Sequence, residues 1–373
     1  MKNILLIEPF CPIPTDSGGK VRILNTIKYL SQKYKISILS FFQNENEKPA
    51  LSKLVVNSTF VKLGPKNNFS PIPYWFSDWY SKEVKKHLQL TDFSNFESVI
   101  VEFSQLLYIV DFLPTTVNTI FVSHDVSTVS YWRRLHEVSL FKKIIHLIRF
   151  VQIYLYERKY LPKYKTVVAV SDIDAKILKK LFNLNNIVVV PNGIESVNFI
   201  NKTTNSPPTL GYLGSTSHSP NKKAIDFIVS HISPLTSSNI IIAGSNDSLQ
   251  FSEKQNVQFK GFIPNTKDFY QQIDILVAPI FSGSGSRIKI LESLSYGIPV
   301  ITTTIGAEGL DINSPYLFIV KEPDKPENWI TAINSIYSNI NANSTSKLKN
   351  QLSKYLWSTT LSLLLPLPRS TDN

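Results

Sequence analysis

The chain contains almost no cysteine, and this absence excludes several architectures. Cys11 is the only cysteine among 373 residues, so the protein has no intramolecular disulfide framework and no multi-cysteine metal site. A reducing compartment fits this composition. The apolar run Ile4–Ile7 is too short for a secretory signal, Glu8 interrupts it, and no other run approaches the length of a membrane-spanning helix. The sequence therefore predicts a cytoplasmic protein.

Familiar motifs for metal ions and nucleophiles are also missing. No cluster of His, Asp or Glu has metal-ligand spacing, and the chain has neither a Gly-x-Ser-x-Gly elbow nor a Walker loop. Asp172 and Asp174 imitate an Asp-x-Asp metal motif. However, Ser171 is a good helix N-cap, and both acids then fall in the first helical turn, where the helix dipole favours them. We predict no metal site and no cofactor.

The charge of the chain is positive and unevenly distributed. The net charge is +11, and the segment Arg133–Lys165 holds nine lysines and arginines against two acids. One face of a predicted helix in this segment carries Lys142, His146 and Arg149, and another face is apolar (Ile144, Ile148, Val151, Leu155). Two interpretations stay open, and both can hold: the apolar face packs on a sheet while the cations meet water, and the cationic face docks on an anionic membrane surface. No recognition motif supports a nucleic-acid partner, and we predict none.

The order of predicted elements indicates two domains. Short β-rich runs alternate with helical segments from Asn3–Ile7 to Ile187–Val190. A polar stretch at about 196–208 then ends in two prolines, and the alternation restarts at Leu210–Leu213. Such alternation predicts parallel sheets with crossover helices. We expect two Rossmann-like α/β domains, residues 1–195 and 209–345, whose parallel sheets face a central cleft. Residues 346–373 are expected to form a C-terminal helix or tail, and packing on the first domain is one arrangement for it.

The richest pattern lies between two predicted buried strands, Asp274–Ile280 and Pro299–Thr303. A turn of glycine and serine separates the first strand from a helix, and it consists of Gly283, Ser284, Gly285 and Ser286. A glycine loop exposes backbone N–H groups, and a helix N-terminus favours negative charge, so this turn predicts an anion site.

The helix after this turn adds charged side chains to the predicted anion site. Arg287 and Lys289 lie in its first turns, where they supply positive charge for a diphosphate, and Glu292 follows. The second strand ends in another glycine loop, which contains Glu308 and Gly309. The carboxyl ends of parallel strands are where α/β folds bind ligands, so both loops are expected to line one site.

This stretch resembles the donor-binding half of the retaining nucleotide-sugar glycosyltransferases of family 4, often called group 1. The resemblance extends over roughly residues 1–340. It includes the loop Ser17-Gly18-Gly19, the segment Ser123-His124-Asp125 and the turn Val190–Gly193. It implies the two-domain B-type glycosyltransferase fold and metal-independent transfer with retention of configuration.

The resemblance also implies roles for single residues. Glu292 matches a glutamate that bonds the nucleotide ribose, and His124 matches a histidine at the donor sugar. Gly18 and Gly19 match a loop where the backbone approaches the diphosphate and the acceptor. Two positions depart from the pattern. Ser284 replaces a glutamate that contacts the transferred sugar, and the loop after Leu210–Leu213 lacks the usual arginine.

These observations predict a glycosyltransferase that moves a sugar from a nucleotide-sugar donor to a hydroxyl acceptor, either a lipid-linked or a polysaccharide precursor of the cell envelope. A position at the inner face of the membrane is one placement for such an enzyme. The two departures motivate an alternative, a nucleotide-sugar-binding protein of the same fold without transferase activity.

Overall fold

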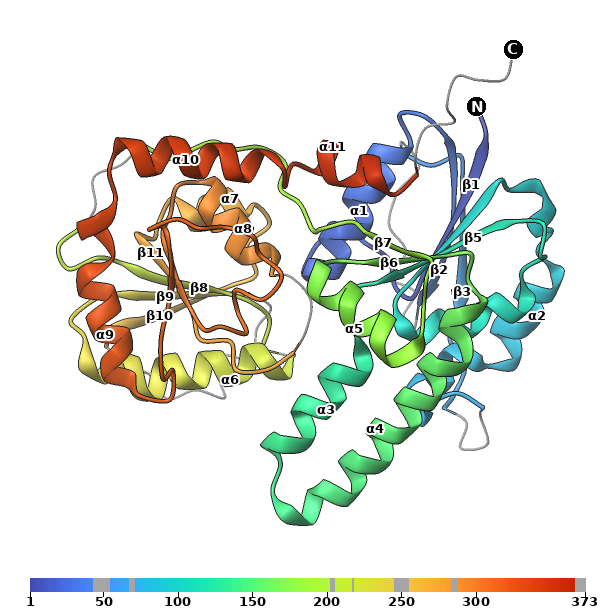
Figure 1. Cartoon of the computed structure of the whole chain (residues 1–373), viewed down its shortest axis with the longest axis horizontal. Helices are drawn as coiled ribbons and strands as arrows, with labels where there is room; N and C mark the ends of the chain where they lie inside the picture. The colour runs from blue at the N-terminus through green and yellow to red at the C-terminus, as the bar shows by residue number, and fades with distance from the viewer. Residues whose placement is uncertain are drawn as a thin grey trace. The chain divides into compact units, whose positions relative to one another are not determined.

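The computed structural model describes residues 1–42, 54–66, 71–201, 205–216, 218–244, 255–283 and 287–365. The chain divides into two compact units, each built on its own sheet (Figure 1). The first unit contains Met1–Pro14, Gly19–Pro191 and the described residues from Leu361 onward, and the second contains Thr15–Gly18 and Asn192–Thr360. The prediction of two parallel α/β domains is confirmed.

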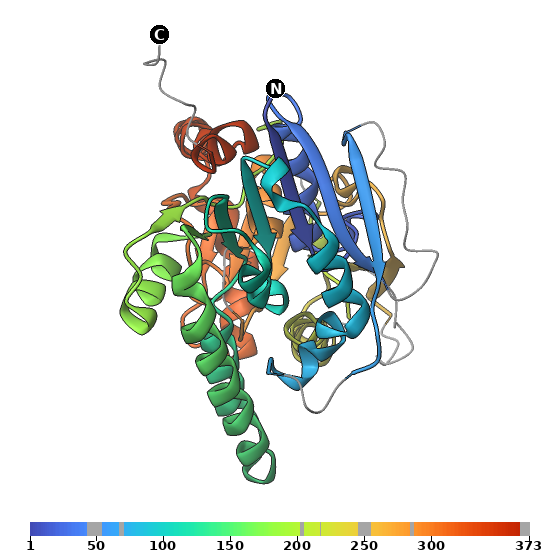
Figure 2. The same ribbon diagram turned by 90° about the vertical axis from the view of Figure 1, so that its right-hand side faces the viewer.

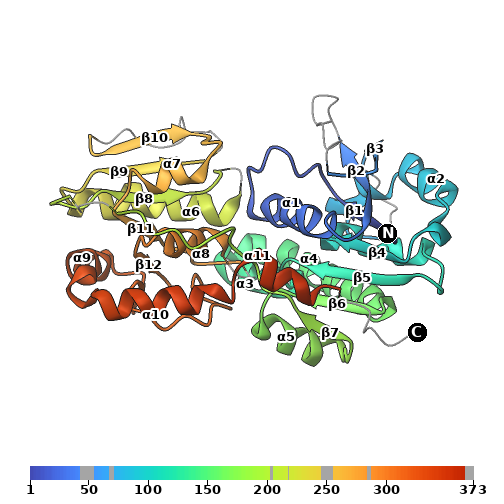
Figure 3. The same cartoon turned by 90° about the horizontal axis from the view of Figure 1, so that it is seen from above.

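The first unit carries a parallel sheet in the order β3-β2-β1-β4-β5-β6-β7 (Figure 3). The strands are β1 Asn3–Glu8, β2 Lys35–Phe42, β3 Asn57–Lys62, β4 Ser98–Glu102, β5 Asn118–Ser123, β6 Thr166–Ala169 and β7 Ile187–Val189. The connecting helices are α1 Gly18–Leu30, α2 Lys82–Leu90, α3 Ser127–Glu137, α4 Leu140–Tyr160 and α5 Asp172–Phe182. Each connection returns the chain to the same edge of the sheet, so all strands point the same way.

The second unit repeats this plan with the order β10-β9-β8-β11-β12-β13. The strands are β8 Leu210–Leu213, β9 Ile240–Ala243, β10 Val257–Gly261, β11 Ile275–Ala278, β12 Val300–Thr302 and β13 Leu317–Ile319. The helices are α6 Ser219–Phe227, α7 Thr266–Tyr270, α8 Ile288–Ser295, α9 Pro326–Ser335, α10 Ala342–Ser353 and α11 Trp357–Thr360.

Side-chain alternation along the central strands of the second unit fills both faces of its sheet. Ile240 and Ile242 join the core with α6 and α9, while Ile241 and Ala243 join the core with α7, α8 and α10. Strands buried on both faces read as continuous apolar runs, which is why the sequence predicted them well.

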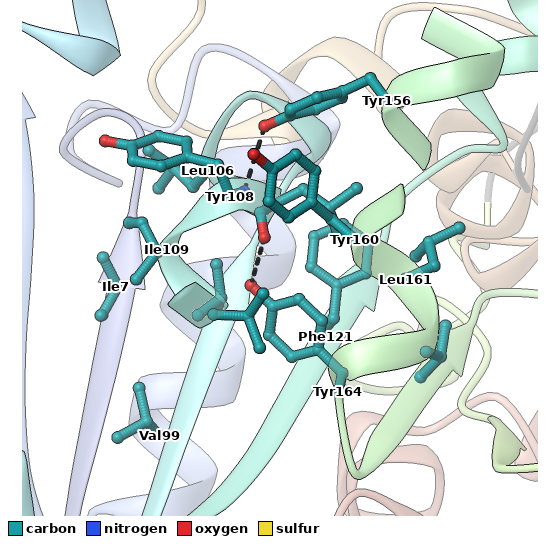
Figure 4. Packing of buried hydrophobic residues seen from close by; sticks show 14 of the residues in the cluster. Ile7, Val99, Leu106, Tyr108, Ile109, Phe121, Tyr156, Tyr160, Leu161 and Tyr164 are labelled. Carbon is teal, nitrogen blue, oxygen red and sulfur yellow. Dashed lines mark hydrogen bonds between the residues drawn. The ribbon is translucent and has the colours of Figure 1, made fainter. Parts of the chain in front are cut away.

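The first unit packs α2, α4 and α5 on one face of its sheet. Figure 4 shows this core, in which the hydroxyl of Tyr156 accepts a hydrogen bond from the Tyr108 N–H at 3.1 Å, and Tyr164 donates to the Leu107 carbonyl at 2.9 Å. Tyrosines can be buried here because each hydroxyl finds a backbone partner. This packing fixes the C-terminal end of α4 against the sheet.

Helix α5 begins as the sequence predicts. Ser171 is its N-cap, and the Ser171 hydroxyl accepts a hydrogen bond from the Asp174 N–H at 3.0 Å. Asp172 and Asp174 therefore lie in the first turn of a helix, where the dipole stabilises acids.

Helix α4 contradicts one of the two interpretations of the basic segment. Ile144, Ile148, Val151 and Leu155 are 69%, 54%, 43% and 57% exposed, so this stripe does not pack on the sheet. The residues of α4 that are fully buried lie on another face (Ile153, Tyr156, Glu157, Tyr160). Periodicity alone revealed an apolar face but not which face meets the core. In the part of the chain that the structure describes, no helix is long and apolar enough to cross a membrane.

Candidate functional site

The carboxyl ends of three neighbouring strands in the second unit gather the predicted donor-side residues. Strand β11 pairs with β12 through Ala278 and Thr302, and with β8 through Leu276 and Gly211. The loops after β8, β11 and β12 therefore leave the same edge of the sheet, which is where α/β folds bind ligands. Helix α8 follows the loop after β11, with Arg287 as its N-cap residue and Lys289 and Glu292 in its first turns.

Lys289 connects α8 to β8 and α6, the two elements that flank the loop after β8. Its ammonium donates to the Tyr212 hydroxyl at 3.1 Å and to the Asn221 side-chain oxygen at 3.0 Å, and it lies 4.3 Å from the centre of the Tyr212 ring. A side chain at Gly214 would come within 2.9 Å of this ammonium. A cation from α8 thus stands beside the loop that lacks an arginine of its own.

Two cations crowd the start of α8. Burial, together with the nearby positive charge of Arg287, lowers the pKa of Lys289 to about 7. The Arg287 guanidinium donates to the Ser282 carbonyl at 3.3 Å. Gly283 has a φ of +100°, and a side chain there would meet the guanidinium at 2.8 Å, so only glycine fits this turn. Crowded positive charge at a helix N-terminus is unfavourable by itself and is relieved by an anion.

Glu292 lies one turn further along α8. The Tyr270 hydroxyl donates to a Glu292 carboxylate oxygen at 3.4 Å and to the Lys289 carbonyl at 3.0 Å. Burial raises the pKa of Glu292 to about 7, and the negative charge of Glu195 acts in the same direction. A half-buried carboxyl held by one phenol still has oxygen lone pairs that can accept hydrogen bonds from hydroxyl groups.

The loop after β12 is tied to the loop after β11. The Thr302 hydroxyl donates to the Ala278 carbonyl at 2.7 Å, and the Thr303 hydroxyl donates to the Ile280 carbonyl. This loop carries Glu308 and Gly309 to the same edge of the sheet, and Gly309 has a φ of +79°, which favours glycine. Of the predicted glycine turn, Gly283 is described, while Ser284, Gly285 and Ser286 lie outside the described residues.

The first unit holds a second group of candidate residues around His124. The imidazole Nε2 lies 2.6 Å from a Glu102 carboxylate oxygen. The Phe103 ring stacks on the imidazole with 3.7 Å between ring centres and 8° between planes. Strands β4 and β5 are neighbours, since Glu102 pairs with Val122, so both side chains stand at the carboxyl edge of their sheet.

Gly19 belongs to the same group because it makes room for Phe103. A Cβ at Gly19 would lie 2.4 Å from the tip of the Phe103 ring, which is closer than atoms approach. A Cβ at Gly18, in contrast, would find its nearest neighbour at 3.6 Å, an ordinary contact. The two glycines of the predicted loop therefore differ, and Gly19 has a steric reason to be glycine.

Sequence reasoning missed two buried acids, Glu102, which contacts His124, and Glu8, whose charge interacts with that of Glu102. Glu8 at the end of β1 and Glu102 at the end of β4 are both fully buried. Burial raises the pKa of Glu8 well above its ordinary value, and the charge of Glu102 adds to this. The Arg22 guanidinium donates to the Val190 carbonyl at 3.0 Å, and burial lowers the pKa of Arg22 to about 10. An acid that ends an apolar strand was the available signal, at Glu8 and again at Glu102.

The opposite edge of the second sheet holds a pocket of about 550 Å³ lined by polar residues such as Thr209, Asn239 and Gln272. It brings together none of the predicted site residues. In the described part of the chain, no three His, Cys, Asp or Glu side chains lie close enough to hold a metal ion.

Residues 207–339 match the family Glycosyl transferases group 1. This range, called the group 1 segment below, includes Arg287, Lys289, Glu292, Glu308 and Gly309, while His124 and the two loop glycines lie outside it. No curated protein matches the chain in sequence.

Solved structures resemble the chain over almost its full length. Sucrose-phosphate synthase from Thermosynechococcus elongatus has a TM-score of 0.74 at 14% identity, covering 98% of this chain and 97% of that chain. Anabaena HepE in complex with UDP and glucose has a TM-score of 0.68 at 12% identity, covering 98% of both chains. A glycosyltransferase from Rickettsia africae has a TM-score of 0.65 at 17% identity, covering 96% of both. The chain has the fold of B-type glycosyltransferases.

Proposed function

We propose that the protein is a glycosyltransferase that moves a sugar from a nucleotide-sugar donor to a hydroxyl acceptor. One observation carries the proposal: Arg287, Lys289 and Glu292 stand together at the carboxyl edge of the second sheet, inside the group 1 segment. HepE, which shares the fold, is solved with UDP and glucose, and this supports a nucleotide-sugar donor for the present chain as well.

In this proposal Arg287 and Lys289 stabilise the nucleoside diphosphate that leaves when the sugar is transferred. Breaking the bond between sugar and diphosphate leaves negative charge on the diphosphate, and Arg287 and Lys289 would stabilise it. By analogy with a lost oxyanion donor, such a cation is worth ~3–4 kcal/mol of the activation barrier. The Lys289 ammonium already stands at the loop after β8 through Tyr212 and Asn221, so it requires little reorganisation to meet a phosphate there.

Glu292 and His124 take the other two roles. The Glu292 carboxylate would accept hydrogen bonds from the ribose hydroxyls of the donor. The contact with Glu102 and the stacking on Phe103 hold the His124 ring in one orientation, which suits a residue that contacts the donor sugar. Gly18, Glu308 and Gly309 are assigned to the donor site as loop residues. We further propose that transfer retains the anomeric configuration and uses no metal ion.

The acceptor is proposed to be a lipid-linked or saccharide precursor made at the inner face of a membrane. The exposed apolar and basic surface of α4 supports this choice, because an enzyme that acts on a lipid-linked substrate gains from staying close to the lipid.

The test begins with donor binding and ends with transfer. Thermal shifts are measured with UDP-, GDP- and ADP-sugars, and a ligand at a hundred times its dissociation constant should stabilise the fold by ~2.7 kcal/mol. Transfer is then measured with crude lipid and oligosaccharide acceptors, with and without EDTA, which should have no effect. Lys289→Met should reduce turnover, whereas Lys347→Met, an exposed lysine on α10, should not. Donor binding without hydrolysis or transfer would favour the binding-protein alternative, and no shift with any nucleotide sugar would reject both.

A further inference from the structure

Helices α3 and α4 form a hairpin that leaves the body of the first unit. Figures 1 and 2 show the two helices running side by side, away from the strands of their sheet. The turn between them, at Val138 and Ser139, forms the tip, and the C-terminal end of α4 forms the root. A projecting hairpin exposes much of its surface, so the residues on that surface indicate what it meets.

The root of the hairpin is fixed by a buried acid. The Glu157 carboxylate accepts hydrogen bonds from the N–H groups of Ser127 at 3.1 Å and Thr128 at 3.0 Å, and from the Thr128 hydroxyl at 2.6 Å. Ser127 and Thr128 open α3, so an acid of α4 binds the N-terminus of its neighbour. These three hydrogen bonds, together with the packing of Tyr156 in the core shown in Figure 4, hold the base of the hairpin in place.

The outer half of α4 uses only one side to contact α3. The Phe150 ring lies 5.3 Å from the Trp132 ring of α3, and His146 is half-buried on the same side. The remaining surface is apolar and exposed, with Phe141 at 94% and Ile144 at 69%. We call the exposed apolar residues of α4 the outer stripe: Leu140, Phe141, Ile144, Ile145, Leu147, Ile148, Val151 and Leu155.

The outer stripe is unusual for a helix that meets only water. A surface helix normally has one apolar face, which it buries, and a polar face outside. Helix α4 has apolar residues on the face toward α3 and again on the outer stripe. A contiguous exposed apolar patch marks a site of protein or membrane contact.

Cations border the outer stripe, and no acid on the surface of α4 balances them. Lys142, Lys143, Arg149, Arg158 and Lys159 are exposed. Glu157 is the only acid in the sequence of α4, and it is 2% exposed and engaged with the start of α3. The partner of this surface is therefore expected to combine an apolar interior with negative charge at its boundary.

We propose that the α3–α4 hairpin inserts its outer stripe into the headgroup region of an anionic membrane leaflet. An interfacial helix places aliphatic and aromatic residues among the acyl chains and its cations among acidic headgroups, and both features are present here. A second copy of the chain would bring an equally positive hairpin against the first, and the like charges would repel. Nucleic acid would pair with the cations but would leave the eight exposed apolar side chains without an apolar partner. The proposal deepens the membrane placement given under Proposed function, but it requires no catalysis.

The experiment is sedimentation of the full chain with liposomes, without nucleotide or acceptor. Liposomes of phosphatidylcholine alone are compared with liposomes that also contain phosphatidylglycerol. The stripe variant, Phe141→Ser with Ile144→Ser and Ile148→Ser, should lose binding by more than tenfold even at low salt. The charge variant, Lys142→Gln with Lys143→Gln and Arg149→Gln, should lose on the order of fivefold for each cation. Leu90→Ser is the matched control, because Leu90 is 75% exposed on α2, and it should bind as the wild type does.

Each outcome decides the proposal. Because the substituted residues are exposed, circular dichroism and melting temperature should stay unchanged in all variants. If the wild type fails to sediment with anionic liposomes, or if the stripe variant sediments equally well, the proposal is wrong. A dimer in light scattering that the stripe variant converts to monomer, together with unchanged lipid binding, would assign the stripe to a second copy instead. Failure of donor binding would reject the proposed function and leave the liposome result unaffected.

Discussion

The ring of Phe103 lies flat against the imidazole of His124, with 3.7 Å between their centres. Phe103 has a φ of +70°, a backbone conformation that non-glycine residues rarely adopt. Strain of this kind persists where surrounding structure enforces it, and it is typical of functional sites. Here the strained backbone positions the Phe103 ring so that it stacks on one face of the His124 imidazole. The Glu102 carboxylate forms a hydrogen bond with Nε2 of the same imidazole.

Loss of the Phe103 ring should therefore loosen His124 without unfolding the protein. An aromatic pair contributes ~0.5–1.5 kcal/mol, so Phe103→Leu is expected to lower kcat by about two- to tenfold. The donor dissociation constant should change less than kcat. Steady-state kinetics measure this split, with Phe112→Leu as the control, because Phe112 packs against Tyr108 and not against His124. Equal losses in both variants would mean that the ring supports only the general packing of the unit.

The second prediction uses the steric relation between Gly19 and Phe103. Gly19→Ala places a Cβ against the Phe103 ring and should displace it, so turnover should fall at least as far as in Phe103→Leu. Gly18→Ala meets only an ordinary contact and separates two explanations for the loop. If both alanines are equally harmful, the loop serves backbone approach to a ligand. Suppose instead that only Gly19→Ala lowers turnover, and that the double variant Gly19→Ala with Phe103→Leu has no lower turnover than Gly19→Ala. Gly19 is then required because it leaves room for the Phe103 ring.

Much of the fold could be predicted from the sequence, and the two missed strands show why the rest could not. The central strands are buried on both faces and therefore read as short apolar runs, as in Ile240–Ala243. Strands β3 and β13 stand at sheet edges, and most of their residues are partly or fully exposed. Strand β3 (NSTFVK) lacks the apolar run on which strand prediction depends, and β13 is apolar but only three residues long.

The candidate site divides in the same way. The glycine turn and the charged start of α8 are adjacent in sequence, so a local pattern predicted them. The contacts of Lys289 with Tyr212, and of Phe103 with Gly19, join residues that are 77 and 84 positions apart. Such contacts depend on strand order and loop direction, which no local pattern encodes. The exposure of the outer stripe was hidden for a related reason, since periodicity shows that faces exist and not which of them is covered.

The third prediction concerns the pKa of Lys289, which lies at about 7 in the free protein. A diphosphate favours the charged ammonium and should raise this pKa, so binding at pH 8 should take up a proton. The affinity for UDP should then fall as the pH rises above 7, by at most tenfold per pH unit. Calorimetry in two buffers of different ionisation enthalpy measures the proton uptake. Lys289→Met should abolish it, and Lys347→Met should not. Uptake that persists in Lys289→Met would assign the proton to another group.

The last prediction separates the effect of Glu292 on the stability of the fold from its role in donor binding. Its pKa of about 7 exceeds the ordinary glutamate value of 4.5, so the folded protein binds more protons than the unfolded chain between these pH values. The free energy of unfolding should therefore decrease as the pH rises from 4.5 to 7. Glu292→Gln removes this decrease and can still accept a hydrogen bond from Tyr270. It should raise the melting temperature at pH 8 by a few degrees and change it little at pH 4.5.

The same variant should bind the donor less tightly. Loss of hydrogen bonds to a charged group costs ~1.5–3 kcal/mol, so calorimetry at pH 8 should show the donor dissociation constant increased by roughly tenfold or more. Glu327→Gln is the matched control, because it removes an exposed acid on α9 and should change neither quantity. A variant that is more stable at pH 8 and also binds the donor normally would place Glu292 outside the donor site. A gain in stability that is equal at both pH values would show that the buried charge is not its cause. Higher stability with weaker donor binding is the expected result, because a half-buried carboxylate with a single phenol as partner is costly until a ligand supplies further hydrogen bonds.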